Sequence, residues 1–224
     1  KGECRDKAIR SYVARVVLPM LPELRLRECT VLDAGCGTGD WLAEIIRQAG
    51  RHHVVDVAEY SLTALKECLD RNSFVREAIL FDANHFPYPA KKFDVIISIN
   101  LLEHIAAPVL FIQKALASLK DRGVLLISTP SRYRFGNIVR VALGRRGTLI
   151  HDLHVTEYTV GQIKEMVRFA GGHVAKTDGT AMVVKGQRMY YLSALISFPL
   201  QWLCKVMGSH HLLHKTVYYR IEKR

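Results

Sequence analysis

The stretch Val31-Leu-Asp-Ala-Gly-Cys-Gly-Thr-Gly-Asp40 opens with apolar residues, turns at three glycines and leads into an amphipathic segment. This pattern predicts a buried strand, a tight turn and the start of a helix. Glycine tolerates positive φ and lets a ligand approach the backbone, and the first helical turn directs free N–H groups to the space above the strand's carboxyl end. We therefore expect a ligand site above this strand.

The spacing of the glycines separates two classes of ligand. A dinucleotide motif, G-x-G-x-x-G, requires a third glycine at position 40, but this chain has Asp40, whose carboxylate would repel a pyrophosphate. A glycine-rich turn that binds nothing is the simplest alternative. The pattern Asp-x-Gly-x-Gly-x-Gly, from Asp33 to Gly39, resembles instead the first motif of the class I S-adenosylmethionine-dependent methyltransferases. In that family the turn holds the methionine and ribose parts of the cofactor.

Composition indicates one α/β domain. The chain has 224 residues, 49% of them hydrophobic and 24% charged, which is enough for a sizeable core. We expect a single domain over residues 1–224 with local insertions. The five cysteines are odd in number and form no C-x-x-C pair, so a disulfide framework or a cysteine zinc site is not indicated and a reducing, cytoplasmic setting is expected. The formal net charge of +11 favours an anionic partner, either nucleic acid or an acidic lipid surface.

Neither a secretory signal nor a membrane span is expected from the apolar runs of this sequence. Lys1–Asp6 is polar, and the apolar residues that follow are interrupted by arginines, so no secretory pattern is present. Cys4–Leu18 has helical spacing and is followed by prolines, which predicts a leading helix across the ligand crevice. The uncharged run Met189–Cys204 has 16 residues and is too short to span a membrane comfortably.

Strand patterns alternate with helical patterns along the middle of the chain. The expected further strands are residues 52–56, 78–81, 93–100 and 123–129, and the expected helices are residues 61–69, 108–119 and 159–169. Such alternation indicates βαβ units and a parallel sheet. Phe93–Asn100 is almost continuously apolar, as a strand covered on both faces must be.

Acidic residues follow two of these strands. Asp56 ends the second expected strand, where a carboxylate can accept hydrogen bonds from both hydroxyls of a ribose. Asp82 follows the third expected strand; taken alone, it is equally well explained as the start of an Asx turn before Pro87.

The order of these features resembles that of the class I methyltransferases over residues 28–178, from the glycine turn through Asp56 and Asp82-Ala83 to Asn100-Leu-Leu-Glu-His104 and Gly123–Pro130. The resemblance implies S-adenosylmethionine as cofactor, S-adenosylhomocysteine as product, and a Rossmann-like α/β fold. Its seven-stranded, mostly parallel sheet has the order 3-2-1-4-5-7-6 with the last strand antiparallel, for which Lys215–Ile221 is expected. The small-molecule subgroup that includes the ubiquinone-biosynthesis O-methyltransferases is the most similar. The implied cofactor residues are Asp33, Ala34, Gly35, Cys36, Gly37, Asp56, Val57, Asp82, Ala83 and Asn100.

Three histidines are catalytic candidates. His151-Asp-Leu-His154 precedes the last predicted helix, and in the resembling enzymes such an element lies close to the transferred methyl group. Histidine, with a reference pKa of about 6.5, suits a base that takes the proton of an acceptor hydroxyl. His104, His151 and His154 are the candidates, and hydrogen-bonded scaffold residues are the alternative. Glu103-His104 also resembles part of a divalent-metal site in some ubiquinone methyltransferases, but that pattern has an acid where this chain has Asn100, so no metal is expected.

Two insertions are expected, one within the resembling part of the chain and one after it. Ser131–Ile150 carries five arginines and no acid, with apolar residues at helical steps, which describes a helix able to lie in a membrane interface. An insertion at this point contacts lipid in the resembling ubiquinone methyltransferases; a solvated cap over the active site is the alternative. The second insertion, about 187–207, is apolar and is expected to form a core or dimer-contact helix, or a second wall of the acceptor pocket.

Three functions follow from this pattern. Methyl transfer from a sulfonium is a direct displacement, so the protein mainly holds acceptor, methyl and sulfur in line and excludes water. The first hypothesis is O-methylation of a small or lipid-like hydroxyl compound, with peripheral contact to an anionic membrane. RNA methylation is the second, favoured by charge but not by Asn100-Leu-Leu-Glu103, which lacks an Asn-Pro-Pro-Tyr-type motif. A non-catalytic scaffold that retains the fold is the third.

Overall fold

The computed structural model describes residues 2–82, 88–180, 199, 202–204, 206 and 213–224. Ala83, which the sequence places in the cofactor site, lies outside these residues. So does most of the second insertion, about 187–207.

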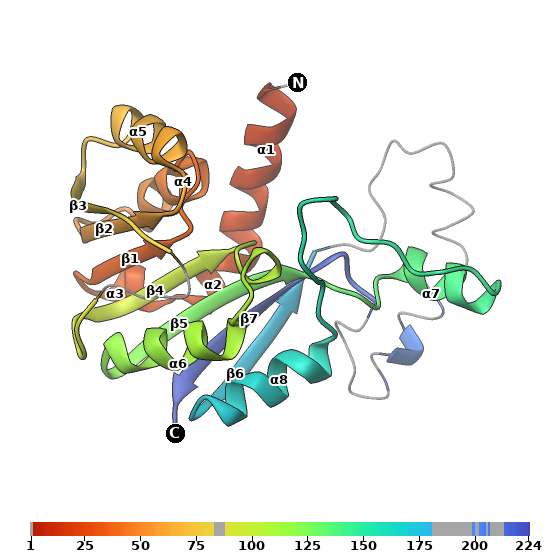
Figure 1. Cartoon of the computed structure of the whole chain (residues 1–224). Coiled ribbons are helices and arrows are strands. Elements are labelled where there is room, and N and C mark those ends of the chain that lie inside the picture. Colours follow the sequence, from red (N-terminus) through yellow and green to blue (C-terminus); the bar gives the residue numbers. More distant parts are fainter. Residues whose placement is uncertain (1, 83–87, 181–198, 200–201, 205, 207–212) are drawn as a thin grey trace.

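Seven strands form one sheet with the order β3-β2-β1-β4-β5-β7-β6, as predicted (Figure 1). Its strands are β1 (Thr30–Ala34), β2 (Val54–Glu59), β3 (Val75–Leu80), β4 (Phe93–Ile99), β5 (Leu119–Pro130), β6 (Gly172–Gly179) and β7 (Thr216–Lys223). The first five strands pair in parallel, whereas β7 runs antiparallel to both β5 and β6. The predicted antiparallel strand at Lys215–Ile221 is therefore confirmed as β7.

Helices cover both faces of the sheet (Figure 1). The helical elements are α1 (Gly2–Tyr12), the π-helix η1 (Val13–Val17), α2 (Leu18–Met20), α3 (Glu23–Leu26), α4 (Asp40–Ala49), α5 (Leu62–Arg71), the 3-10 helix η2 (Leu102–His104), α6 (Pro108–Ser118), α7 (Phe135–Ala142) and α8 (Val160–Phe169). One buried cluster joins the sheet to η1, α4 and α5, and a second joins it to α6 and α8.

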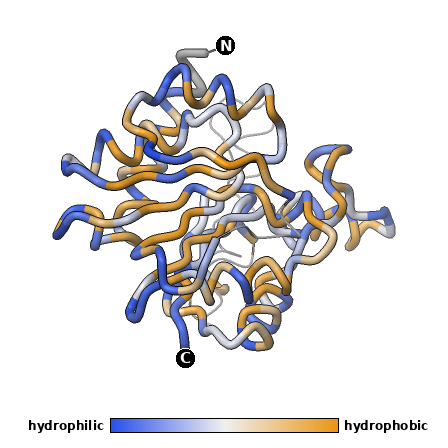
Figure 2. The backbone as a smooth tube through the Cα atoms, turned by 60° about the vertical axis from the view of Figure 1, so that its left-hand side comes forward, coloured by the Kyte–Doolittle hydropathy of each residue, from blue (hydrophilic) through white to orange (hydrophobic). Residues whose placement is uncertain are grey.

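Successive residues along the central strands point to opposite faces of the sheet and so belong alternately to these two clusters. Val31 belongs to the cluster beneath α4, whereas the next residue, Leu32, belongs to the cluster beneath α6. In β4, Val95 and Ile97 face one cluster and Ile96 faces the other. Because the central strands β1, β2 and β4 bury both faces, their sequences are largely apolar, which appears as the orange central strands of Figure 2. The carboxyl ends of β1, β2 and β4 are thereby fixed side by side.

The leading helix occupies a different place from the predicted one. Gln48 of α4 donates a hydrogen bond to the carbonyl of Arg10, so α1 packs beside α4, with which it makes direct contact. No residue of α1 lines the cavity at the end of β1. The expectation that this helix crosses the ligand crevice is therefore wrong, because its apolar residues are buried against α4 and the sheet instead.

None of the helices in the described part of the chain has both the length and the apolar character that a membrane-spanning helix needs.

Candidate functional site

A cavity of 350 Å³ opens at the carboxyl ends of β1, β2 and β4. Its walls come from the turn after β1, from the first residues after β2 and from the segment after β4. The lining residues are Asp33, Gly35, Cys36, Gly37, Thr38, Asp40, Trp41, Glu59, Tyr60, Ser61, Ala64, Ile99, Asn100, Leu101 and His104. This is where the sequence predicted a ligand site, and five of the ten predicted cofactor residues are among the lining residues.

The glycine turn shapes the floor of this cavity. Gly37 has φ +54°, a left-handed conformation that glycine adopts without strain, and a Cβ atom placed there would meet no other atom within 4 Å. The space beside the Gly37 backbone is therefore open to a ligand. Its N–H is not available, since it donates to the Glu59 carboxylate over 2.7 Å.

Glu59 is the acid that ends β2. It is 3% exposed, and both of its oxygens accept backbone hydrogen bonds: one from Gly37, the other from the N–H groups of Tyr60 (3.0 Å) and Ser61 (3.1 Å). These bonds fix the carboxylate in one orientation at the cavity wall. Carboxylate oxygens have further lone pairs, so Glu59 can still accept hydrogen bonds from ligand hydroxyls.

Asp56, the acid that we predicted for this role, lies away from the cavity. Its carboxylate is fully buried and pairs with Arg76 (2.9 and 2.7 Å) and with Lys92 (3.0 Å). In the parallel register Asp56 stands opposite Leu32, in the middle of β1, and β2 continues for three more residues. The prediction was wrong about position because it ended the strand at the first acid.

A signal for Glu59 was present in the sequence. The apolar residues Val57 and Ala58 continue the strand beyond Asp56, and Glu59 then precedes Ser61, which caps α5 by accepting a hydrogen bond from the N–H of Ala64. Val57, another predicted cofactor residue, is fully buried in the core, and so is Ala34. Both lie behind the cavity wall rather than in it.

Asp33 lies at the base of the cavity and is 3% exposed. Burial raises the pKa of its carboxyl well above the usual range, and the nearby Cys68 and Glu59 add to the shift. Asn100, on the opposite wall, has φ +54°, and its N–H donates to the carbonyl of Ser128 over 3.0 Å. Asn100 adopts this left-handed conformation at the point where β4 turns into η2.

Two further cavities share residues with the first. One, of 580 Å³, is mostly apolar and is lined by Tyr60, Asp82, Leu101, His104, Ile105, Ala106, Leu153 and Val155. It contains Asp82 and shares Tyr60, Leu101 and His104 with the cavity at the turn. Asp33 thus lines the first cavity and Asp82 the adjoining one, whereas Asp56 lines neither.

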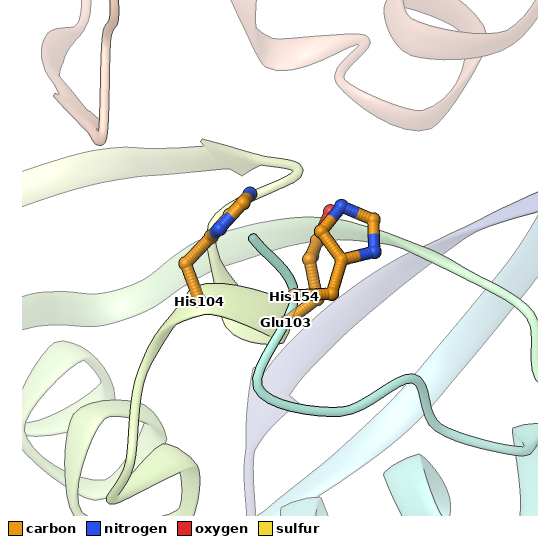
Figure 3. Close-up of side chains that lie close together, drawn as sticks. All are labelled: Glu103, His104 and His154. Carbon is orange, nitrogen blue, oxygen red and sulfur yellow. The ribbon is translucent and has the colours of Figure 1, made fainter. Parts of the chain in front are cut away.

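The third cavity, of 420 Å³, gathers the three predicted catalytic histidines. It is lined by Asn100, Glu103, His104, Pro130, Ile150, His151, Leu153, His154, Lys215 and Thr216. The ring centroids of His104 and His154 are 4.9 Å apart, and those of His151 and His154 are 5.9 Å apart. Residues from two segments about fifty positions apart thus form one cluster beside the first cavity. Figure 3 shows two of these histidines, His104 and His154, together with Glu103.

A buried ion pair holds the segment that carries His154. Glu157 accepts hydrogen bonds from Arg134, from the N–H of Ile150 and from a ring nitrogen of His154, Nδ1, over 3.2 Å. Arg134 also donates to the carbonyls of Ser131 and Thr148. Arg134 is one of the five arginines of the first insertion, Ser131–Ile150, but its side chain is mostly buried because it pairs with the buried carboxylate of Glu157.

Glu103 lies beneath the histidines with its side chain fully buried. One of its oxygens accepts a hydrogen bond from the Thr129 hydroxyl over 3.1 Å. Burial raises the pKa of Glu103 to about 7, and the negative charge of Glu157 acts in the same direction. Glu103, His104 and His154 each offer one donor atom, and these three atoms lie within 4.8 Å of one another, so the described residues contain a group able to hold a cation.

Comparison with known proteins identifies the family. Residues 5–182 match the family described as a methyltransferase domain. A probable S-adenosylmethionine-dependent methyltransferase of Mycolicibacterium smegmatis is 27% identical over 150 residues, which are 66% of this chain and 54% of that protein. A ubiquinone biosynthesis O-methyltransferase of Haemophilus ducreyi is 36% identical over 108 residues, 46% of this chain and 45% of that protein. The chain spans about half the length of these curated relatives.

Solved structures share the fold. A methyltransferase from Archaeoglobus fulgidus gives a TM-score of 0.65 at 15% identity, covering 98% of this chain and 94% of that one. Magnesium protoporphyrin IX methyltransferase from Synechocystis, with bound S-adenosylhomocysteine, gives 0.63 at 15% identity, covering 98% and 84%. With the 3-2-1-4-5-7-6 sheet and the family match over most of its length, the chain belongs to the class I S-adenosylmethionine-dependent methyltransferases.

Proposed function

We propose that this chain transfers the methyl group of S-adenosylmethionine to a hydroxyl oxygen of a small or lipid-like compound. The observation that carries the proposal is the continuity of the cavities. The cavity at the glycine turn shares Asn100 and His104 with the cavity that holds the histidine cluster. A cofactor in the first cavity would therefore have its reactive end beside a second space of suitable size for an acceptor.

The cofactor residues in this proposal differ in part from those expected from sequence. Glu59 replaces Asp56 as the residue that accepts hydrogen bonds from the ribose hydroxyls, because it lines the cavity and its carboxylate is held in place. Asp82 remains the candidate for the adenine amine, with Tyr60 and Leu101 on the walls of the same apolar cavity. Asp33 and the backbone of Gly37 face the methionine end.

The acceptor site in this proposal is the cavity of the three histidines. Displacement at a sulfonium needs alignment more than chemical activation, and a hydroxyl acceptor must also lose its proton. His104, His151 and His154 all border the cavity, so an imidazole is at hand to accept that proton. Ile150 and Leu153 supply apolar wall for a hydrocarbon part of the acceptor.

Methyl transfer is tested with radiolabelled S-adenosylmethionine and three probes: 3,4-dihydroxybenzoate, 4-nonylphenol and total RNA. The expected result is label on one of the two hydroxyl compounds and none on RNA. Label on RNA alone would replace the proposal with RNA methylation. Calorimetry with S-adenosylhomocysteine is run in parallel, since a chain that binds no cofactor would be a scaffold that retains the fold.

We propose in addition that the segment around α7 contacts an anionic membrane. α7 lies beyond the carboxyl ends of the strands, away from the sheet (Figure 1). The side chains of Val139, Val141 and Leu143 are exposed there, in the same segment as Arg140, Arg145 and Arg146, which are also exposed. Exposed apolar residues next to cationic ones are the combination that binds an acidic lipid surface.

Flotation with vesicles of phosphatidylcholine and phosphatidylglycerol tests this contact. We expect the chain to float with these vesicles at low salt, and the double substitution Val141→Asp, Leu143→Asp to abolish flotation, since each buried side chain contributes about 1.5 kcal/mol or more. Leu26→Asp is the matched control, because Leu26 in α3 is 73% exposed, much like Leu143 at 68%. Equal loss in both variants, or no flotation of the unmodified chain, would contradict the proposal.

A further inference from the structure

We propose that Glu103, His104 and His154 form a binding site for a divalent transition-metal ion of the Zn²⁺ class. The three residues come from two segments, η2 and the loop before α8, and their side chains turn toward one another (Figure 3). Their donor atoms lie within 4.8 Å of one another. The inference goes beyond methyl transfer, since metal binding is measured without cofactor or acceptor.

The Glu103 carboxylate lacks a partner on one side. Its Oε2 atom accepts a hydrogen bond from Thr129, but its Oε1 atom has no hydrogen-bond partner among the described residues, although it is buried. A buried polar atom without a partner costs free energy, and a carboxylate costs more than a neutral group. A cation at this position would satisfy Oε1.

Both imidazoles have their Nε2 atom available to bind a metal ion. His104 Nδ1 lies 3.2 Å from the carbonyl oxygen of Leu153, and His154 Nδ1 lies 3.2 Å from a carboxylate oxygen of Glu157. A carbonyl or carboxylate only accepts hydrogen bonds, so Nδ1 carries the proton in each ring and Nε2 keeps its lone pair. Metal-binding histidines typically show this arrangement, in which a carbonyl or carboxylate fixes the ring through the other nitrogen.

The charges around the site also favour a cation. Glu103 and Glu157 are both buried acids, and among the described residues Arg134 forms an ion pair with Glu157 and not with Glu103. A divalent ion between Glu103 and the imidazoles would supply the positive charge that Arg134 supplies to Glu157.

The donor set selects the kind of metal. Two imidazole nitrogens and one carboxylate oxygen suit Zn²⁺ and its transition-metal neighbours, whereas Mg²⁺ prefers oxygen ligands and water. Zn²⁺ holds such ligands at about 2.0–2.2 Å, so the three donor atoms would have to approach one another slightly, which rotation of the imidazoles permits. The fourth position would face the cavity, as in zinc sites that keep an open position.

The sequence led us to expect no metal, because Asn100 stands where an acid was needed. The third donor is instead His154, fifty positions further along the chain than His104. With His104 and His154 bound through Nε2, His151 would be the imidazole left beside the acceptor cavity.

Calorimetric titration of the chelator-treated full chain with Zn²⁺ and with Mg²⁺ tests the site. We expect one Zn²⁺ per chain that is lost in His154→Ala and in the nearly isosteric variant Glu103→Gln, and much weaker binding of Mg²⁺. His151→Ala is the matched control, because His151 belongs to the same cluster but not to the donor set, and it should keep the site. Glu157→Gln should weaken Zn²⁺ binding about 10- to 100-fold, the usual effect of losing the group that orients a ligand histidine.

Two further measurements make the result decisive. Thermal unfolding and binding of S-adenosylhomocysteine show whether each variant is folded. If His154→Ala does not fold, the loss of Zn²⁺ binding is judged from Glu103→Gln, which preserves the shape of the side chain. Co²⁺ absorption then reports the ligands, since cysteine ligation gives an intense charge-transfer band that this site should lack. Zn²⁺ binding unchanged in both Glu103→Gln and His154→Ala, equal affinity for Mg²⁺, or a thiolate band for the bound Co²⁺ would each overturn the proposal.

Discussion

The substitution Glu59→Gln is expected to weaken binding of S-adenosylhomocysteine about 100-fold. Hydrogen bonds to a charged acceptor contribute about 1.5–3 kcal/mol each, roughly twice the value for a neutral acceptor, and two ribose hydroxyls would donate to Glu59. The amide has a further disadvantage. Both oxygens of Glu59 accept hydrogen bonds from backbone N–H groups. In glutamine one of these oxygens becomes an NH₂ group, which cannot accept, so at least one backbone N–H would face another donor.

Asp56→Asn is the matched control for this measurement. It removes one charge from the same strand, but the carboxylate that it replaces pairs with Arg76 and Lys92 outside the cavity. We expect a lower unfolding temperature and an unchanged dissociation constant by calorimetry. If instead Asp56→Asn weakened binding as much as Glu59→Gln, Glu59 could not be assigned as the residue that binds the ribose.

The substitution Gly39→Ala is expected to destabilise the fold by about 3 kcal/mol. Gly39 has φ +80°, where a side chain is strained, and its Cβ would lie 2.4 Å from the Asn72 amide nitrogen and 2.7 Å from the Cys68 sulfur. Neither neighbour can move easily, because both are buried and the same amide donates to the Cys68 carbonyl over 2.8 Å. Strain and crowding therefore add.

Gly50→Ala separates these two contributions. Gly50 follows the other end of α4 with a similar φ of +70°, but no atom lies within 4 Å of the added Cβ. We expect a loss of about 1 kcal/mol from backbone strain alone. The free energies of unfolding are compared by urea denaturation, with the slopes checked for equality. Equal losses in the two variants would show that crowding of the Gly39 turn by Cys68 and Asn72, at the end of α5, adds nothing to the backbone strain.

Much of the fold was predictable because it follows from local patterns. The apolar run of β4 predicted a strand, because a strand buried on both faces needs an almost continuous apolar sequence. The glycines after β1 predicted a tight turn, because glycine adopts positive φ without strain. The family resemblance then supplied the strand order and the antiparallel β7, which spacing alone could not have given.

The site was only partly predictable, and the errors have physical reasons. Asp56 and Glu59 are both acids in one strand, and only the register with β1 shows which of them reaches the edge of the sheet. Glu157 was missed because its importance depends on its contacts with Arg134 and His154, which lie on either side of a loop. The donor group of Glu103 and His154 likewise exists only after folding, because the two residues are far apart in sequence.

The Arg134–Glu157 pair also links two parts of the molecule mechanically. Arg134 immediately precedes α7, whereas Glu157 orients the ring of His154 and accepts from the backbone of Ile150. Asn137, within α7, fastens the returning chain by exchanging hydrogen bonds with Thr148. If contact with a surface displaced α7, Arg134 would move the Glu157 carboxylate, which orients the imidazole of His154. A contact at the edge of the molecule would thereby change the geometry of the histidine cluster.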